Sequence, residues 1–164
     1  MYGNALEFLE EERDAWRPYE ALAELPDAAL ERETDPEGPG LGWSGRVLAG
    51  HMLAWLEHAL AVARELAVGT ATPTRDAMRA DWDARGDAVN DDLMARWAAL
   101  PLDEVRRRLR DVPGELRGSL TVVPETRWIK DPDVSGFFFS ETIEHYEEHM
   151  PQLRAVLEAA SAAS

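Results

Sequence analysis

Apolar residues recur every three or four positions along most of this chain, which is the period of an amphipathic helix. The clearest stretch begins at Ser44, a favourable N-cap residue, and ends at Gly69. Its apolar stripe consists of Leu48, Met52, Trp55, Ala59, Val62 and Leu66. No segment shows the sustained alternation of apolar and polar residues that is typical of a strand. The pattern therefore predicts an all-α protein.

Other helices are predicted on both sides of this one. Residues 5–25 carry leucines and a tryptophan at helical spacing, so a first helix is expected there. Residues 35–42 contain three glycines and two prolines, and this composition predicts a loop. The apolar stripe of residues 72–98 is interrupted by Gly86, which predicts two shorter helices joined by a kink.

The C-terminal half predicts two more long helices. One begins near Pro101 and carries Pro113, where a bend is expected because proline removes a backbone hydrogen bond. Residues 122–135 are predicted to be a loop, and a last helix is predicted over residues 138–160. Pro151 lies inside that helix, so a kink is expected there. The prediction is a single bundle domain of about four long helices with accessory helices.

Composition narrows the class of protein. The chain has 164 residues, of which 45% are hydrophobic, and this is enough for one domain with a substantial core. No apolar run approaches the roughly 20 residues of a membrane span, and the N-terminus lacks a signal-peptide pattern, so a cytoplasmic protein without membrane partners is expected. Since the chain has no cysteine, any thiol chemistry must come from a bound small molecule.

The charge balance argues against nucleic acid as a partner. Lysine and arginine number 17, aspartate and glutamate number 32, and the net charge is −15. A field of that sign repels a polyanion. No nucleic-acid binding is therefore predicted.

Histidines are the candidate metal ligands. His145 and His149 are spaced i, i+4, so they project from one face of a helix and can hold the same metal ion. His51, on another apolar helix, offers a third nitrogen. Three histidine ligands leave coordination positions open, as catalytic sites do. His58 lies on the same face as His51 but about 10 Å along the axis, so the two cannot both bind one ion directly.

The residues alone leave two interpretations open. The histidine pair can be a metal site, or it can be two polar residues on the surface of a charged helix. If the site binds metal, Glu148 lies next to a ligand and is the candidate general base toward a bound water.

Two phrases of the chain resemble the DinB/YfiT-like family. The sequence Gly-Trp-Ser at residues 42–44, followed by His51 and Trp55, resembles the second helix of that family, with its first metal histidine at this spacing. Residues 141–149 resemble the last helix, which supplies the other two histidines. The phrases around Asn90 and at residues 100–105 look closest to the ClbS/DfsB-type branch.

The resemblance implies a fold, ligands and a class of reaction. The fold is a four-helix bundle with a crossover between its second and third long helices, often as a homodimer. His51, His145 and His149 carry over as ligands of nickel, zinc or a similar divalent ion. The family includes isomerases and S-transferases that use a low-molecular-weight thiol, and a hydrolase that confers resistance to a toxic small molecule. A detoxification or stress-response role on a small-molecule substrate is therefore expected.

Several residues are candidates for the pocket around such a site. Arg46, one turn before His51, is a candidate positive charge for an anionic thiol. The aromatic candidates can form pocket walls for an apolar substrate or be ordinary core residues; they are Trp43, Trp55, Phe138 and Tyr146. The competing functional class is a non-catalytic helical module that sequesters a ligand or partner and has a vestigial metal site.

Overall fold

The computed structural model describes residues 2–162, and within that span the regular structure is entirely helical. The all-α prediction is confirmed. In chain order the elements are α1 (Ala5–Trp16), the 3₁₀ helix η1 (Arg17–Glu24), α2 (Asp27–Leu30), α3 (Gly45–Val68), α4 (Pro73–Arg85), α5 (Ala88–Ala98), α6 (Leu102–Val122), the 3₁₀ helix η2 (Glu125–Arg127), α7 (Pro132–Phe139), the π-helical turn η3 (Ser140–Glu144), α8 (His145–Glu148) and α9 (Met150–Ala162).

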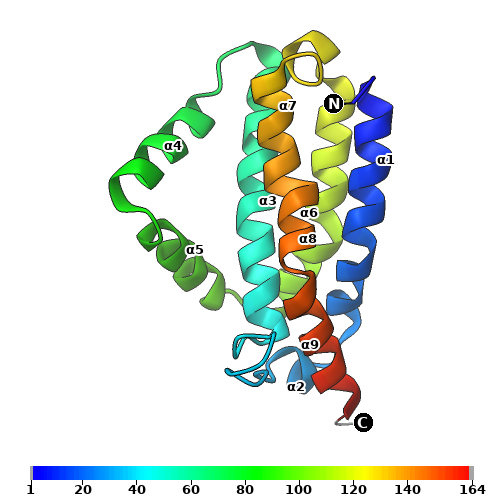
Figure 1. The fold of residues 1–164 in the computed structure, drawn as a ribbon, viewed down its shortest axis with the longest axis vertical. Coiled ribbons are helices and arrows are strands. Elements are labelled where there is room, and N and C mark those ends of the chain that lie inside the picture. The colour runs from blue at the N-terminus through cyan, green and yellow to red at the C-terminus, as the bar shows by residue number, and fades with distance from the viewer. Residues whose placement is uncertain (1, 163–164) are drawn as a thin grey trace.

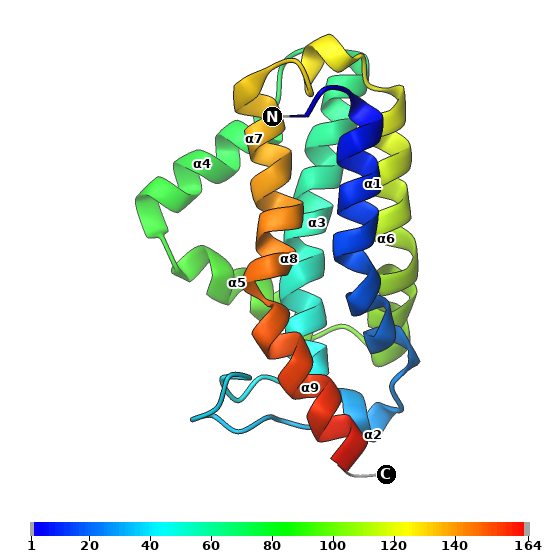
Figure 2. The same cartoon turned by 45° about the vertical axis from the view of Figure 1, so that its right-hand side comes forward.

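The long helices lie side by side. Figures 1 and 2 show α1, α3, α6 and the C-terminal segment α7–α9 running along the long axis of the molecule. α3 contacts α6, α9 and η3, and α1 contacts α6 and η3. Between α3 and α6 the chain passes through α4 and α5, which project to one side as an angled arm (Figure 1). Among the described residues, none of the helices is both long and apolar enough to span a membrane.

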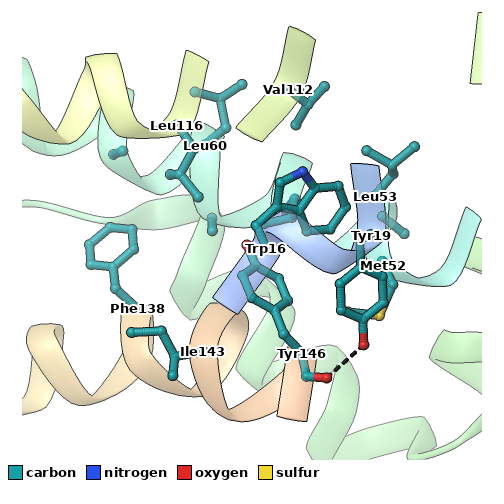
Figure 3. Close-up of a cluster of buried hydrophobic side chains, with 14 of the residues drawn as sticks. Trp16, Tyr19, Met52, Leu53, Leu60, Val112, Leu116, Phe138, Ile143 and Tyr146 are labelled. Carbon is teal, nitrogen blue, oxygen red and sulfur yellow. Dashed lines mark hydrogen bonds between the residues drawn. The ribbon is translucent and has the colours of Figure 1, made fainter. Parts of the chain in front are cut away.

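The core lies where these helices face one another. α3 buries most of its length, and large side chains from α1, η1 and the C-terminal segment pack against it (Figure 3). Among the fully buried side chains are Trp16, Tyr19, Met52, Leu53, Phe138 and Tyr146. Truncation of one such aromatic side chain costs about 3–5 kcal/mol, so these contacts fix how the C-terminal segment sits on α3.

Local sequence explains the ends of several helices. The Ser44 hydroxyl accepts a hydrogen bond from the Val47 amide, at 3.2 Å, and α3 begins there and ends at Gly69 as predicted. Gly86 separates α4 from α5 with a φ of +54°, a conformation that L side chains rarely adopt. The prediction of two shorter helices joined at this glycine is confirmed.

Two predicted boundaries were wrong. The first helix does not continue to residue 25, because Pro18 has no amide hydrogen and the chain follows the 3₁₀ helix η1 from Arg17. The last helical segment begins at Pro132 and not at residue 138, since the Asp131 carboxylate caps it by accepting from two backbone amides. α6 continues as a single helix from Leu102 past Pro113 to Val122.

Candidate metal centre

Three histidines from distant parts of the chain converge on one point. The Nε2 atom of His51, on α3, lies 2.9 Å from Nε2 of His145 and 3.0 Å from Nε2 of His149. One ring nitrogen from each of the three lies within 4.8 Å of the others. The structure thus brings together the three predicted ligands, and it separates them from His58, the fourth histidine, which is not part of the group.

The spacing of these nitrogens fits a single cation. Two nitrogens, each about 2.1 Å from one ion, are separated by about 3.0 Å at a right angle and about 3.4 Å at a tetrahedral angle. Hydrogen bonds among the three rings pair fewer of these nitrogens. If His51 Nε2 carries a hydrogen, it can donate it to His145 or to His149, and the lone pair of the other ring stays unpaired. A divalent cation accepts all three lone pairs at once.

The surroundings keep the imidazoles neutral. Burial, together with the neighbouring His149, lowers the pKa of His51 to about 4. Burial and the two other rings lower the pKa of His145 to about 3. Burial also lowers the pKa of His149, opposed by Gln152 and Glu148. Neutral rings have free lone pairs near pH 7, and a metal ligand needs such a lone pair.

The helix that carries two of the histidines is irregular on both sides of them. The π-helical turn Ser140–Glu144 comes directly before His145, and π-helical turns occur often at functional sites. His149 leaves helical geometry, with φ −94° and ψ 5°, two residues before Pro151. The kink expected from Pro151 therefore falls at a histidine of the group itself.

Trp43 and Gln152 are neighbours of His149. The Trp43 ring stacks on the His149 ring at 5.5 Å between centroids and 21° between planes, and it also lies 5.2 Å from His51. His149 Nδ1 and Gln152 Oε1 are both buried without a hydrogen-bond partner, and Gln152 is close enough to raise the pKa of His149. A small rotation of the Gln152 side chain would let its oxygen accept from Nδ1, leaving Nε2 for the cation.

The histidines lie at one end of a pocket of about 660 Å³, a volume in the usual range for small-molecule sites. Its walls come from α3, from the α4–α5 arm and from the C-terminal segment. The Trp55 indole donates a 3.1 Å hydrogen bond to Asn90 Oδ1, which ties the arm to α3 beside the site. The other principal lining residues are Trp43, His58, Arg75, Met78, Trp82, Phe137, Glu141 and Glu148.

Some of the predicted pocket residues line the pocket, and others are buried in the hydrophobic core. Trp43, Trp55 and Glu148 line the pocket. Phe138 and Tyr146 do not line the pocket. Both side chains are fully buried in the hydrophobic core, so these two residues are ordinary core aromatics.

Arg46 also lies outside the pocket lining. Its guanidinium is used elsewhere: Nη1 donates to the Glu31 carboxylate at 2.6 Å, and Nη2 donates to the Ala98 carbonyl at 2.9 Å and to the Leu100 carbonyl. The expectation that Arg46 offers its charge to an anionic thiol is therefore wrong in this structure.

Sequence reasoning missed four charged residues of the pocket, which are Arg75, Arg79, Asp83 and Glu141. Glu141 is four residues before His145, and this helical spacing could have drawn attention to it; burial raises the pKa of its carboxyl to about 8. Arg75 lies on α4, and no local pattern shows that α4 reaches the site. His58, predicted to be a bystander, lines the pocket without joining the histidine group.

Comparison of the chain with family models, with curated proteins and with solved structures finds no match. The relation to the DinB/YfiT-like family therefore stays a prediction that rests on the motifs around Trp43, His51 and His149.

Proposed function

We propose that this protein is a divalent-metal-dependent enzyme that acts on a small molecule, with His51, His145 and His149 as the metal ligands. The observation that carries the proposal is the convergence of three neutral imidazoles, 2.9 and 3.0 Å apart at Nε2, at one end of a pocket of about 660 Å³. A divalent ion supplies Lewis-acid chemistry, since it polarises a substrate oxygen and lowers the pKa of a water or a thiol.

Two carboxyl groups of the chain can move protons beside the histidines. Glu141, with its pKa raised to about 8, carries a proton at neutral pH and can donate it to a leaving group. Glu148 lies on the exposed side of the pocket and offers a carboxylate that can accept one. Of the two, Glu141 is the more deeply placed, so we assign it the acid role and keep Glu148 as the base.

The reaction class follows from the resemblance to the DinB/YfiT-like family. Thiol-dependent S-transfer or isomerisation and hydrolysis are both compatible with three histidines, and nickel or zinc is the proposed ion. The chain contains no cysteine, so thiol-dependent S-transfer or isomerisation would need a low-molecular-weight thiol as a second substrate. A role in detoxification or stress response inside the cytoplasm is part of this proposal.

The finer fold assignment belongs to the same proposal. A DinB-like four-helix bundle would be made by α1, α3, α6 and the α7–α9 segment, which lie side by side (Figure 2). Its crossover would be the path through α4 and α5 that links α3 to α6. We also propose a homodimer, on the strength of the resemblance alone.

A non-catalytic binding module is the second candidate. The observation in its favour is the aromatic lining of the pocket, where Trp55 and Trp82 lie 6.0 Å apart and can hold an apolar ligand without any ion.

Elemental analysis tests the metal assignment directly. Untagged protein, reconstituted with nickel or zinc and then dialysed, should retain about one ion per chain, and His51→Ala should retain none. His58→Ala is the matched control, because His58 is a buried histidine of the same helix and pocket outside the group. Retention of the ion by a variant lacking His51, His145 and His149 would overturn the proposal.

Activity separates the two candidates. The metal-loaded protein should accelerate thiol transfer or hydrolysis in a screen of electrophiles and esters, and a chelator should abolish the activity. If the protein binds one ion and a ligand but shows no turnover, the non-catalytic binding module is supported instead.

A further inference from the structure

At the end of the pocket away from the metal group lies an unusual cation, Arg75. Its side chain is only 11% exposed, and its Nε and Nη1 atoms are buried without a hydrogen-bond partner. The only ion pair of this guanidinium among the described residues is made by Nη2 with Asp133, at 2.6 Å. In this side-chain conformation neither donor has an acceptor, so both would be paired only if the guanidinium turned toward one.

Contacts across the pocket place Arg75 relative to the histidines. Its guanidinium carbon lies 5.6 Å from the centre of the Phe137 ring, and that ring lies 5.6 Å from the His58 ring. His58 is seven residues after His51 on α3, which corresponds to about 10 Å along the helix axis. These contacts bring the cation near His58, which lies about two helical turns from His51 along α3, so the cation and the histidine group are on the order of 10 Å apart.

The arginines of the pocket lining, Arg75 and Arg79, are close together on α4. Arg79, one turn after Arg75 on α4, also faces Asp133, at 3.9 Å, so two cations share one carboxylate at this end. At the other end Glu148 belongs to the same turn as His145, and Asp83 on α4 is a further acidic residue of the lining. A negatively charged group that enters the metal-free pocket is attracted toward Arg75 and Arg79.

Between the two ends much of the wall is aromatic and apolar, and Asp83, Asn90 and Ser140 also line it. Trp55 and Trp82 meet edge to face, and Met78 lies one turn before Trp82 on α4. These side chains suit a hydrocarbon or aromatic body and offer few polar partners.

We propose that the pocket binds a small organic anion with an apolar or aromatic body, whose carboxylate pairs with Arg75 and whose other end reaches the three histidines. The distance between the two ends requires a body of roughly 10 Å. The assignment of a reacting group at the histidine end rests on the proposed function, but recognition of the anion does not need a metal. The guanidinium is held by a single ion pair with exposed Asp133, so it can turn its free donors to the ligand.

Binding of a matched pair of probes tests this proposal without any metal. ω-Phenylhexanoate and its neutral amide have the same apolar body, and their binding to chelator-treated protein can be followed by calorimetry and by quenching of the pocket tryptophans. The acid should bind at least about tenfold more tightly than the amide. In Arg75→Gln the two probes should bind equally, whereas the control Arg79→Gln should keep most of the preference for the acid.

Each outcome is decisive. Equal binding of acid and amide by the parent protein, no binding of either, or a preference for the acid that survives in Arg75→Gln would overturn the proposal. If Arg75→Gln does not fold by circular dichroism, Asp133→Asn replaces it; this variant frees the guanidinium and should tighten binding of the acid only, and unchanged binding would overturn the proposal.

The two proposals fail separately. Absence of a bound ion leaves the preference for the acid intact, because the probes are compared in chelator-treated protein. Loss of that preference leaves the elemental analysis of the histidine group unaffected.

Discussion

The Tyr146 hydroxyl donates a 2.8 Å hydrogen bond to Oε1 of Glu12, and both side chains lie in the protein interior. The other carboxylate oxygen of Glu12 accepts from Arg117 at 2.8 Å. Tyr146 directly follows His145, so this network fixes the turn that presents the histidine against α1 and α6. Burial raises the pKa of Glu12, and the hydrogen bonds from Arg117 and Tyr146 oppose that shift.

Removal of the Tyr146 hydroxyl should destabilise the protein. Tyr146→Phe leaves the Glu12 carboxylate one donor short in a site that water does not reach, and the free energy of unfolding should fall by about 1–3 kcal/mol. Urea denaturation measures the change. In a double-mutant cycle with Glu12→Ala the two losses should not add, and simple additivity would show that the hydrogen bond contributes nothing.

Metal binding should stabilise the fold. Nickel or zinc at a free concentration about a thousand times the Kd should raise the free energy of unfolding by about 4 kcal/mol, seen as a higher Tm that a chelator reverses. His145→Ala should abolish this stabilisation, whereas His58→Ala should retain it. A rise in Tm that persists in His145→Ala would place the ion elsewhere.

Gln152 should tune the affinity of the metal site. Gln152→Leu removes the amide oxygen that can accept from His149 Nδ1, so metal affinity should fall about 10-fold to 100-fold while the number of ions per chain stays at one. Competition with a chromophoric chelator measures the affinity. Gln152→Glu, which keeps an acceptor at this position, should lose much less.

Glu141 should make the metal-free protein less stable as the pH rises. Its pKa is about 4.5 in the unfolded chain and about 8 in the folded one, so the folded state holds the proton more tightly. This contribution is complete below about pH 4.5 and is lost as the pH rises through about 8. Because the half-buried side chain faces an open pocket, the loss should be about 1–3 kcal/mol.

Chemical denaturation of chelator-treated protein at a series of pH values tests the Glu141 prediction. Glu141→Gln carries no titrating group at this position, so its stability should vary less over the same interval. Identical pH profiles for the parent and the variant would show that Glu141 titrates normally.

Helices with strong local signals were predicted correctly. Ser44 and Gly69 bound α3, and Gly86 divides α4 from α5, because caps and glycine act on the backbone within a few residues. The spacing of His145 and His149 was sufficient to predict a shared face. The wrong start of α7 also had a local signal, since Asp131 is followed by a proline at the first helical position.

The hydrophobic periodicity could not predict contacts between distant segments of the chain. His51 and His145 are 94 residues apart, and their meeting depends on how the C-terminal segment packs on α3. The same limit explains Phe138, whose side chain turns into the core, and Arg75, which reaches the pocket only because the α4–α5 arm folds back beside α3. Periodicity predicts the face of a helix but not its partner.

The π-helical turn Ser140–Glu144 holds one residue more than an α-helical turn would over the same path. Deletion of that single residue would rotate everything before it by about 100° relative to everything after it. Phe138 anchors the segment in the core, and His145 belongs to the metal group. After the deletion, only one of the two side chains could keep its present neighbours. For this stretch of sequence, an in-frame loss of one codon is thus a more severe change than most substitutions, and chain length here is as constrained as residue identity.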